Sequence, residues 1–530
     1  MPPIDPSPLR GWRFVLFNGA ISLANVVVLS NVPGYTILAP YAAGDLGGVT
    51  PSFGTWATTD HMIGMALGFP IARWLAARFG DYRVYTAALV VYAAASLFCV
   101  ISETMWLFLP SRIVLGLAGG VVLLLGQSLL LGEYPPERRT IGVGVWGVLG
   151  MAPFTVGVFL GGWYAEYLGW RALFYSNIPV ALTVAGVVAS LLHRRGFRRR
   201  DMRFDCVGFV LLAAILLGLQ TIFNQGNDFD WFESPILASA LGVVVVALPC
   251  FVIWELAERH PAIDVRLFAY RNYTIAMICS VLGFLVIQGL LSVFVGQLQL
   301  LLGYSSSLAG VVYLSMVFLS VPLVAIIHEL CRNVDVRLVA CLNFLGFAVT
   351  LTWIGLYDKH GSFDQIALPM FFFGFSLAAF FAPLASLAMN GLPGKRLIRA
   401  AEELTLLRTS AGAFGIALLG VVQFRRTPLH QLDIADHVGG RRFASLDLLS
   451  QFSEKLEASG FTDSAARGQL GRLMRQQASL LGLNDAFLLG ACVFVGLAAL
   501  VWLAKPTTVA PTKRVETLRQ MQAEELVEQP

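Results

Sequence analysis

Residues 105–131 read MWLFLPSRIVLGLAGGVVLLLGQSLLL, and Arg112 is the only charged side chain in this run. A helix that crosses the hydrocarbon core of a bilayer needs about 20 mostly apolar residues, so the run is long enough to span a membrane. A transmembrane β-strand needs only about 10 residues and alternates polar with apolar positions, which this run does not. The stretch therefore predicts a membrane-spanning helix.

The composition of the whole chain fits the same interpretation. Its 530 residues are 57% hydrophobic and only 13% charged, whereas soluble domains carry about 25% charged residues. This balance excludes a soluble multidomain protein, a disordered chain, collagen and a secreted disulfide scaffold. The net charge of +4 is small, and the basic residues lie in short loops between apolar runs, so we do not expect a nucleic-acid partner.

Apolar runs of this length recur along the chain, and we predict an all-α polytopic membrane protein with fourteen transmembrane helices. The predicted spans are 14–42, 53–76, 84–102, 105–131, 141–165, 172–192, 206–224, 234–256, 273–301, 306–328, 337–357, 366–390, 400–423 and 484–504. The first span follows no small-residue cleavage site, so we expect it to be retained and not removed as a signal peptide.

The loops between these spans alternate in charge. Every second loop is basic, and the loops between them are nearly free of Lys and Arg. The basic loops hold Arg78 and Arg83, Arg138 and Arg139, residues 193–203, Arg259 to Arg271, Arg332 and Arg337, and Lys395 to Arg399. Because basic loops stay on the cytoplasmic side, this alternation predicts a multi-pass inner-membrane protein with both termini in the cytoplasm.

Two segments depart from the short-loop pattern. Residues 424–483 form a long polar segment with amphipathic stretches at 446–456 and 468–477 that we expect to be helical. Residues 506–530 form a charged tail that we expect to lie in the cytoplasm. The seven cysteines follow no metal-binding or disulfide spacing, and no nucleotide-binding, metalloprotease or Ser-His-Asp pattern occurs. We therefore expect a non-enzymatic protein without a cofactor or a metal.

Two motifs have a functional and a structural interpretation. Arg78, Gly80, Asp81 and Arg83 could lock two helix ends together or form an ordinary basic loop. The glycines Gly157, Gly161 and Gly162 give the fifth span a smooth face, used for packing or for helices that slide during a transport cycle.

Charges inside apolar spans are the strongest candidates for function. Arg112 costs a few kcal/mol inside the membrane unless it is paired or hydrated, so it either has a coupling role or snorkels to the surface. Asp60 and His61 lie side by side in the second span, and they form either a titratable site or an inert, solvated vestibule. Glu402 and Glu403 lie at the inner end of the thirteenth span, and we interpret them as surface or gating charges.

Together these motifs resemble the major facilitator superfamily, and within it the fourteen-span drug:proton antiporters of the EmrB/QacA type. The matching segments are Leu75–Arg83, Arg112–Gly116, Gln127–Arg139, Gly157–Gly162, Gly169–Pro179, Arg408–Gly415 and Trp502–Pro506. The resemblance implies an N-terminal six-helix bundle at 1–194, a linker with two inserted helices at 195–272, and a C-terminal six-helix bundle at 273–505. It also implies proton-coupled export of amphiphilic small molecules or drugs by alternating access, with a periplasmic membrane-fusion adaptor and an outer-membrane channel as partners.

The chain departs from the family pattern at the residue most tied to coupling. Asn31 stands where the family's first span usually has an aspartate, Val158 replaces a proline and Arg73 replaces a glycine. Since asparagine does not titrate, we predict that Asp60 takes over the role of the missing acid. The candidates for coupling or substrate binding are Asp60, His61, Asn31, Arg112, Arg408, Gln127 and Gln288. Two alternatives stay open: a dedicated exporter of one metabolite, such as a siderophore, an aromatic acid or a lipid, and a non-transporting scaffold or receptor.

Overall fold

The computed structural model describes residues 9–47, 51–135, 139–193, 202–356, 363–392, 394–438 and 462–506, together with residues 451, 454, 455 and 458. Within these ranges every regular element is a helix. The α-helices are α1 (Trp12–Asp45), α2 (Pro51–Phe79), α3 (Asp81–Ile101), α4 (Met105–Glu133), α5 (Arg139–Tyr167), α6 (Ala172–Leu192), α7 (Cys206–Gln225), α8 (Pro235–Ala257), α9 (Arg271–Leu300), α10 (Ser306–Asn333), α11 (Val336–Gly355), α12 (Phe363–Ala378), α13 (Phe381–Met389), α14 (Gly394–Val438) and α16 (Asp463–Leu500). Three short 3₁₀ helices lie at η2 (Trp231–Glu233), η3 (Val265–Ala269) and η4 (Val501–Leu503).

The helices have the length and surface of membrane spans. Among the described residues, 11 helices are long and apolar enough to cross a bilayer, so the polytopic all-α prediction is confirmed, while the count of fourteen stays a prediction. α2 is not among the 11, and it carries Asp60 and His61 in its first half and Arg73 and Arg78 in its second. α8 exposes Val246, at 64% of its surface. An apolar helix face of this kind suits contact with lipid chains and not with water.

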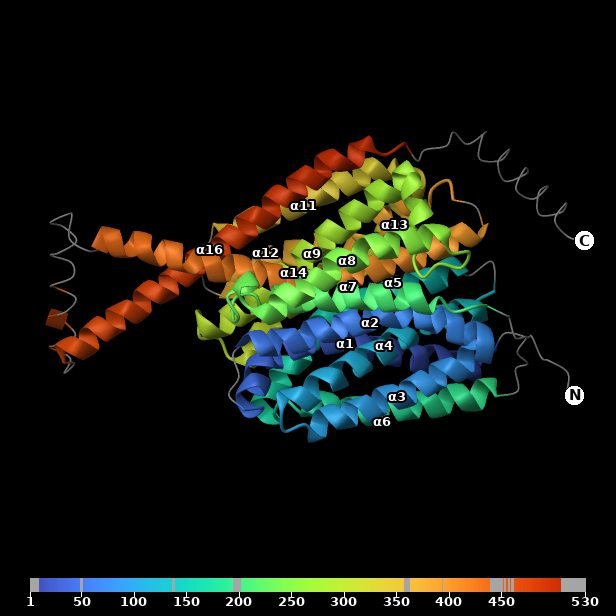
Figure 1. Ribbon diagram of the computed structural model, residues 1–530, viewed down its shortest axis with the longest axis horizontal. Helices are drawn as coiled ribbons and strands as arrows, with labels where there is room; N and C mark the ends of the chain where they lie inside the picture. The colour runs from blue at the N-terminus through green and yellow to red at the C-terminus, as the bar shows by residue number, and fades with distance from the viewer. Residues whose placement is uncertain are drawn as a thin grey trace, which may run out of the picture.

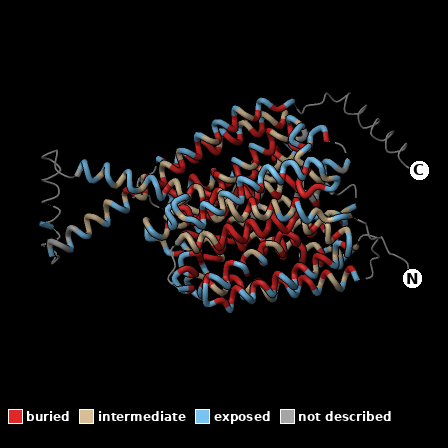
Figure 2. Tube along the Cα trace, viewed as in Figure 1, coloured by how far each residue is buried: buried red, intermediate tan, exposed pale blue. Residues whose placement is uncertain are grey.

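The helices lie side by side along the long axis of the molecule, with α1–α6 on one side of α7 and α8 and the C-terminal helices on the other (Figure 1). The main pairings in the first half are α2 with α4, α1 with α5 and α3 with α6. In the second half α9 pairs with α14, α11 with α16 and α10 with α12. The buried residues concentrate in the middle of the bundle (Figure 2).

The main contacts between the two halves involve α5, α2 and α7. α5 packs along α10, α2 packs along α14, and α7 contacts both α2 and α14. We call the end of the bundle that holds the α2–α3 turn, the α8–α9 connection and the start of α14 the basic end, because Arg78, Arg83, Arg266, Arg396 and Arg399 lie there. The other end is called the opposite end.

Two predicted boundaries differ from the structure. The predicted span 366–390 is divided into α12 and α13. Pro383 lies in the first turn of α13, where its ring and its missing N–H do not fit a helix that continues from α12. The second difference concerns the long polar segment. Residues 424–438 continue α14 and residues 463–483 are the first part of α16, so much of the segment forms two helices that project beyond the bundle (Figure 1).

The projecting helices are tied together at their base. Arg426 Nε lies 2.5 Å from Asp485 Oδ2, and His430 Nε2 lies 2.7 Å from the same oxygen. The stretch 468–477, expected to be helical, lies within α16. Most of 446–456, and all of 507–530, lie outside the described residues.

Candidate functional site

Arg112 lies in the interior of the N-terminal half. It is 0% exposed, so it does not snorkel to the protein surface. Its Nε donates to the carbonyl oxygen of Ala57 at 3.0 Å, and its Nη1 donates to Asn31 Oδ1. The guanidinium carbon lies 4.3 Å from the ring centroid of Tyr35. The charge is therefore held by α1 and α2 from both sides of α4, which is how a membrane protein offsets the cost of burying an arginine.

Glycines let α2 and α4 approach closely enough to form this site. A Cβ on Gly116 of α4 would lie 2.0 Å from the carbonyl oxygen of His61, and one on Gly120 would lie 2.1 Å from that of Met65. On α2, a Cβ on Gly64 would lie 2.3 Å from the carbonyl oxygen of Ile113. Small residues that bring two helix backbones together are typical of membrane helix pairs. Gly64 and Gly68 are four residues apart on α2, and this spacing, which is typical of close helix pairs, was not among the predicted motifs.

Asp60 and His61 complete a polar cluster around Arg112. Both side chains are buried, and His61 Nδ1 lies 3.4 Å from the carbonyl oxygen of Arg112. Asp60 follows Ala57, whose carbonyl oxygen accepts from Arg112, by three residues on α2, which is less than one helical turn. We call Asn31, Asp60, His61 and Arg112 the Arg112 cluster.

The inserted helix α7 touches the same part of α2. Asn224 Nδ2 donates to Thr59 Oγ1 at 3.2 Å, beside Asp60. The side chain of Thr59 is itself fully buried. The cluster is thus covered by α7, and the inserted pair of helices is not a peripheral addition.

The predicted candidates in the second half lie apart from this cluster. Arg408 of α14 is half-buried, with its guanidinium carbon 4.5 Å from the ring centroid of Phe381. Gln288 of α9 is buried. A Cβ on Gly412 of α14 would lie 2.8 Å from Met62 Cε of α2 and 3.0 Å from Gln288 Cγ, so Gln288 lies where the two halves meet. Gln127 is exposed near the basic end of α4 and belongs to neither group.

The predicted gating motifs form close helix contacts. Gly80 separates α2 from α3 with a φ of 96°, a conformation that glycine adopts without strain. The other three members of that turn, Arg78, Asp81 and Arg83, are exposed. In α5, a Cβ on Gly157 would lie 2.7 Å from the carbonyl oxygen of Ser30, one on Gly161 would lie 2.4 Å from that of Gly34, and one on Gly162 would lie 2.2 Å from that of Ser306. The smooth face of α5 therefore packs on α1 and on the start of α10.

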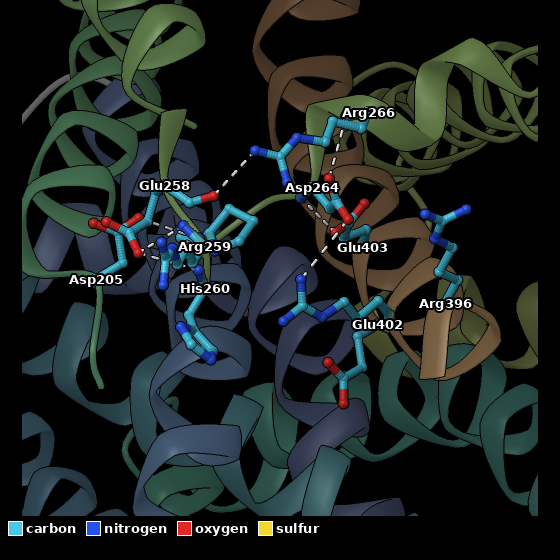
Figure 3. Close-up of polar contacts among 12 residues, drawn as sticks. Asp205, Glu258, Arg259, His260, Asp264, Arg266, Arg396, Glu402 and Glu403 are labelled. Atoms are coloured by element: carbon cyan, nitrogen blue, oxygen red, sulfur yellow. Dashed lines mark hydrogen bonds and ion pairs between the residues drawn. The ribbon is translucent and has the colours of Figure 1, made fainter. Parts of the chain in front are cut away.

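An ion pair at the basic end was not expected from the sequence. Arg73 Nη1 of α2 lies 3.1 Å from Glu402 Oε2 of α14, and Arg73 Nη2 donates to the carbonyl oxygen of Pro261 at 3.3 Å. Figure 3 shows Glu402 beside Glu403 and Asp264 at this junction. The sequence analysis noted Arg73 only as a departure from a motif. The sequence feature that could have indicated this ion pair is a lone arginine in one apolar span together with an acid in another span.

The halves also meet at the opposite end. Tyr41 of α1 shares a hydrogen bond of 2.8 Å with Ser306 Oγ, and Ser307 N donates to Glu166 Oε1 of α5 at 3.0 Å. Contacts therefore join the halves at both ends, and a path to the interior from either side requires one set to open.

Comparison with known proteins agrees with this arrangement. The family model described as Major Facilitator Superfamily matches residues 21–418. The chain belongs to the major facilitator superfamily. It is 30% identical to the multidrug export protein EmrB of Haemophilus influenzae over 500 residues, which cover 94% of this chain and 97% of that one. It is also 30% identical to the fatty acid resistance protein FarB of Neisseria gonorrhoeae over 503 residues, 95% of this chain and 98% of that one.

The resemblance to the EmrB/QacA type within the superfamily is thereby confirmed. Solved structures support the fold. The peptide transporter PepTSo superposes with a TM-score of 0.60 at 14% identity, covering 94% of this chain and 100% of that one. A bacterial homologue of the lysosomal transporter Spinster, in an inward-facing and occupied conformation, gives a TM-score of 0.58 at 15% identity, over 94% of this chain and 98% of that one. The chain is a transporter of this superfamily.

Proposed function

We propose that this transporter exports amphiphilic small molecules across the inner membrane in exchange for protons. The observation that carries the proposal is the Arg112 cluster. It places a carboxyl group, Asp60, inside a membrane helix bundle beside a buried arginine. An ionisable residue inside a membrane span marks a substrate or proton pathway by default. The relatives named multidrug export proteins support small-molecule export as the task.

The cycle we infer alternates between the two sets of contacts that join the halves. Opening of the basic end separates α2 from α14 and breaks the ion pair of Arg73 with Glu402. Opening of the opposite end separates α1 and α5 from α10 and breaks the bonds of Ser306 and Ser307. Rigid rocking of two helix bundles around a fixed central site is the general way in which such folds give alternating access.

Asp60 and Arg112 supply the coupling step in this proposal. When Asp60 is ionised, it neutralises part of the Arg112 charge. When Asp60 takes up a proton, Arg112 depends on its bonds to Asn31 and Ala57 alone. Since Asn31 does not titrate, Asp60 is the acid of this cluster that exchanges a proton between the two sides of the membrane.

The topology and the partners are part of the same proposal. Fourteen spans place the basic end and both termini in the cytoplasm, as positive loops require. The projecting parts of α14 and α16 then extend into the periplasm, where they would dock a membrane-fusion adaptor that leads to an outer-membrane channel. Labelling of single cysteines at position 396 and position 470 in intact cells tests this. If position 396 were labelled and position 470 were not, the true orientation in the membrane would be the reverse of the proposed one.

A dedicated exporter of one lipid-like metabolite is the second candidate. An apolar pocket of about 40 Å³ lies between α9, α11, α12 and α16 near the opposite end, with Gln297 and Asn484 as its polar side chains. Its apolar lining includes Phe294, Leu298, Ile354, Ile366, Leu480 and Phe487. This lining suits part of an alkyl chain, and the relative FarB is named for resistance to fatty acids.

The test uses purified transporter in vesicles that contain a pH-sensitive dye. We expect substrate-induced proton movement that is lost in Asp60→Asn, while substrate binding and expression stay within about twofold, because the amide keeps the shape but does not titrate. His61→Ala is the neighbouring control and should have a weaker effect. Normal proton exchange in Asp60→Asn would place the coupling acid elsewhere. A panel that contains a cationic dye and a medium-chain fatty acid separates the two candidate substrates.

A further inference from the structure

Residues 258–270, which connect α8 to α9, form a strap across the basic end. The strap contacts both halves of the transporter. Asp264 N donates to Glu403 Oε1 of α14 at 2.6 Å, and Arg399 of α14 lies 3.7 Å from Asp264 Oδ2. On the other side Pro261 accepts the hydrogen bond from Arg73 of α2. Opening of this end therefore requires the strap to leave at least one half (Figure 3).

Asp205 anchors the strap to the inserted helices. It is the N-cap of α7, where Oδ1 accepts from Gly208 N at 2.8 Å and from Trp254 Nε1 of α8 at 2.9 Å. Its Oδ2 accepts from Ala262 N of the strap at 3.3 Å. The Asp205 carboxylate thus joins α7, α8 and the strap through three N–H donors.

A second carboxyl group lies against Asp205. Glu255, near the end of α8, is 0% exposed, and neither of its oxygens has a hydrogen bond of good geometry to any described residue. The backbone N–H groups of Ala262 and Ile263 only approach it. The point where a Cβ on Gly208 would lie is 2.2 Å from Asp205 Oδ2 and 2.5 Å from Glu255 Oε1. The two carboxyl groups are therefore close neighbours, with Glu255 completely buried and Asp205 half-buried.

Two carboxylates this close repel each other strongly when both are ionised, and such pairs hold one proton between them. Asp205 accepts three N–H groups in good geometry. Glu255 accepts none in good geometry, although the backbone N–H groups of Ala262 and Ile263 approach it, so a shared proton belongs on Glu255. We propose that Asp205 and Glu255 form a proton-binding site that controls whether the strap is docked across the basic end.

The direction of the effect follows from linkage. The docked strap covers Glu255, whose side chain is completely buried, and undocking admits water to it. Because burial disfavours a charged carboxylate, the docked state binds the proton more tightly than the undocked state. Docking is therefore favoured at acidic pH and lost as the pH at the basic end rises. If the proposed export in exchange for protons is correct, an acid cytoplasm would close the basic end and limit further proton entry.

Other charged groups face this site and need controls. They are His260, Asp264 and Arg266 of the strap, Glu403 and Arg399 of α14, Arg73 of α2, and Arg203 just before α7. Histidine is the side chain that most often acts as a switch near neutral pH, so His260 is the main rival for a pH effect on the strap.

Hydrogen–deuterium exchange of the purified full chain in detergent tests the proposal without any transport assay. The reporters are the amides of Ala262 and Asp264, which are bonded only when the strap is docked. Glu255→Gln mimics the protonated pair. Each variant is compared with the wild type at the same pH, so that intrinsic exchange cancels. We expect equal exchange at acidic pH. At alkaline pH the wild type should exchange faster, by about tenfold per pH unit, because one proton is released on undocking.

Two matched variants complete the experiment. Glu258→Gln removes an exposed carboxylate of the same strap, whose pKa is lowered by the backbone N–H groups of His260 and Arg259, and it should leave the pH dependence unchanged. His260→Gln should also leave it unchanged. Equal exchange of the wild type and Glu255→Gln at every pH would overturn the proposal, as would loss of the pH dependence in His260→Gln. Neither result bears on proton-coupled export, which the Asp60→Asn flux assay tests.

Discussion

Replacing Arg112 by lysine keeps a positive charge in the N-terminal half but removes the planar group that reaches two acceptors at once. Arg112 donates to Ala57 and to Asn31 and lies 4.3 Å from the ring centroid of Tyr35. A single ammonium group keeps one of these acceptors and leaves the other buried without a donor.

The expected loss follows from these contacts. A hydrogen bond to a charged group contributes about 1.5–3 kcal/mol, and a desolvated cation–π contact contributes about 2 kcal/mol. Loss of one bond and part of the ring contact lowers the free energy of unfolding by about 3 kcal/mol. Because Asn31 and Asp60 then lose their fixed partner, we also expect much reduced transport with normal membrane insertion.

Arg408→Lys is the matched control. The described contacts of Arg408 are with aromatic rings, 4.5 Å to Phe381 and 5.6 Å to Phe284, and an ammonium group keeps a contact of that kind. We expect a change in stability below about 1 kcal/mol. Chemical unfolding in detergent and flux into vesicles measure the two effects. Unchanged flux and stability in Arg112→Ala would refute the reasoning, since the buried arginine would then hold nothing in place.

Two further predictions concern contacts between helices. Arg73→Glu should favour opening of the basic end, measured as faster labelling of a buried cysteine from that side. The double variant Arg73→Glu with Glu402→Arg should restore wild-type labelling. If swapping the two charges did not restore it, the ion pair would be incidental. In Gly116→Leu, even the Cβ of the new side chain would lie 2.0 Å from the carbonyl oxygen of His61. We therefore expect thermal unfolding to show a fold destabilised by about 3 kcal/mol or more. Gly132 has open space around it, so Gly132→Leu should be tolerated in the same assay.

The sequence was sufficient for the membrane class and for the Arg112 cluster. Long apolar runs predict spans because each span carries its own signal. Arg112 and Asp60 stood out for the same reason, since a charge inside an apolar run is costly wherever its partner is. The partner of Arg112 was not predictable in this way. Asn31 is 81 positions away in the chain, and local patterns contain no information about which helices pack together.

The basic end shows what the sequence analysis could not resolve. Arg73 and Glu402 are 329 positions apart, and charges near helix ends look like ordinary loop charges until the fold brings them together. Glu255 lies at the end of the predicted span 234–256, where a carboxylate can ordinarily reach water, yet it is completely buried. The extended α14 was missed for a different reason. Its polar last part has no apolar run, and its helix is stabilised by contact with α16.

α2 connects the two polar regions of the transporter. Asp60 and Arg73 lie 13 positions apart on it, or about 20 Å at 1.5 Å per residue, and glycine packing holds α2 firmly against α4 between them. A shift of α2 that follows a change at Asp60 is therefore transmitted to Arg73, and through Arg73 to both Glu402 and the strap. A change at Arg73 or the strap is likewise transmitted to Asp60, because coupling between two sites is reciprocal. A strap docked on Arg73 favours the position of α2 in which the basic end is closed. If both proposals are correct, proton binding at Asp205 and Glu255 is coupled to proton binding at Asp60 through this helix, without any contact between the two sites.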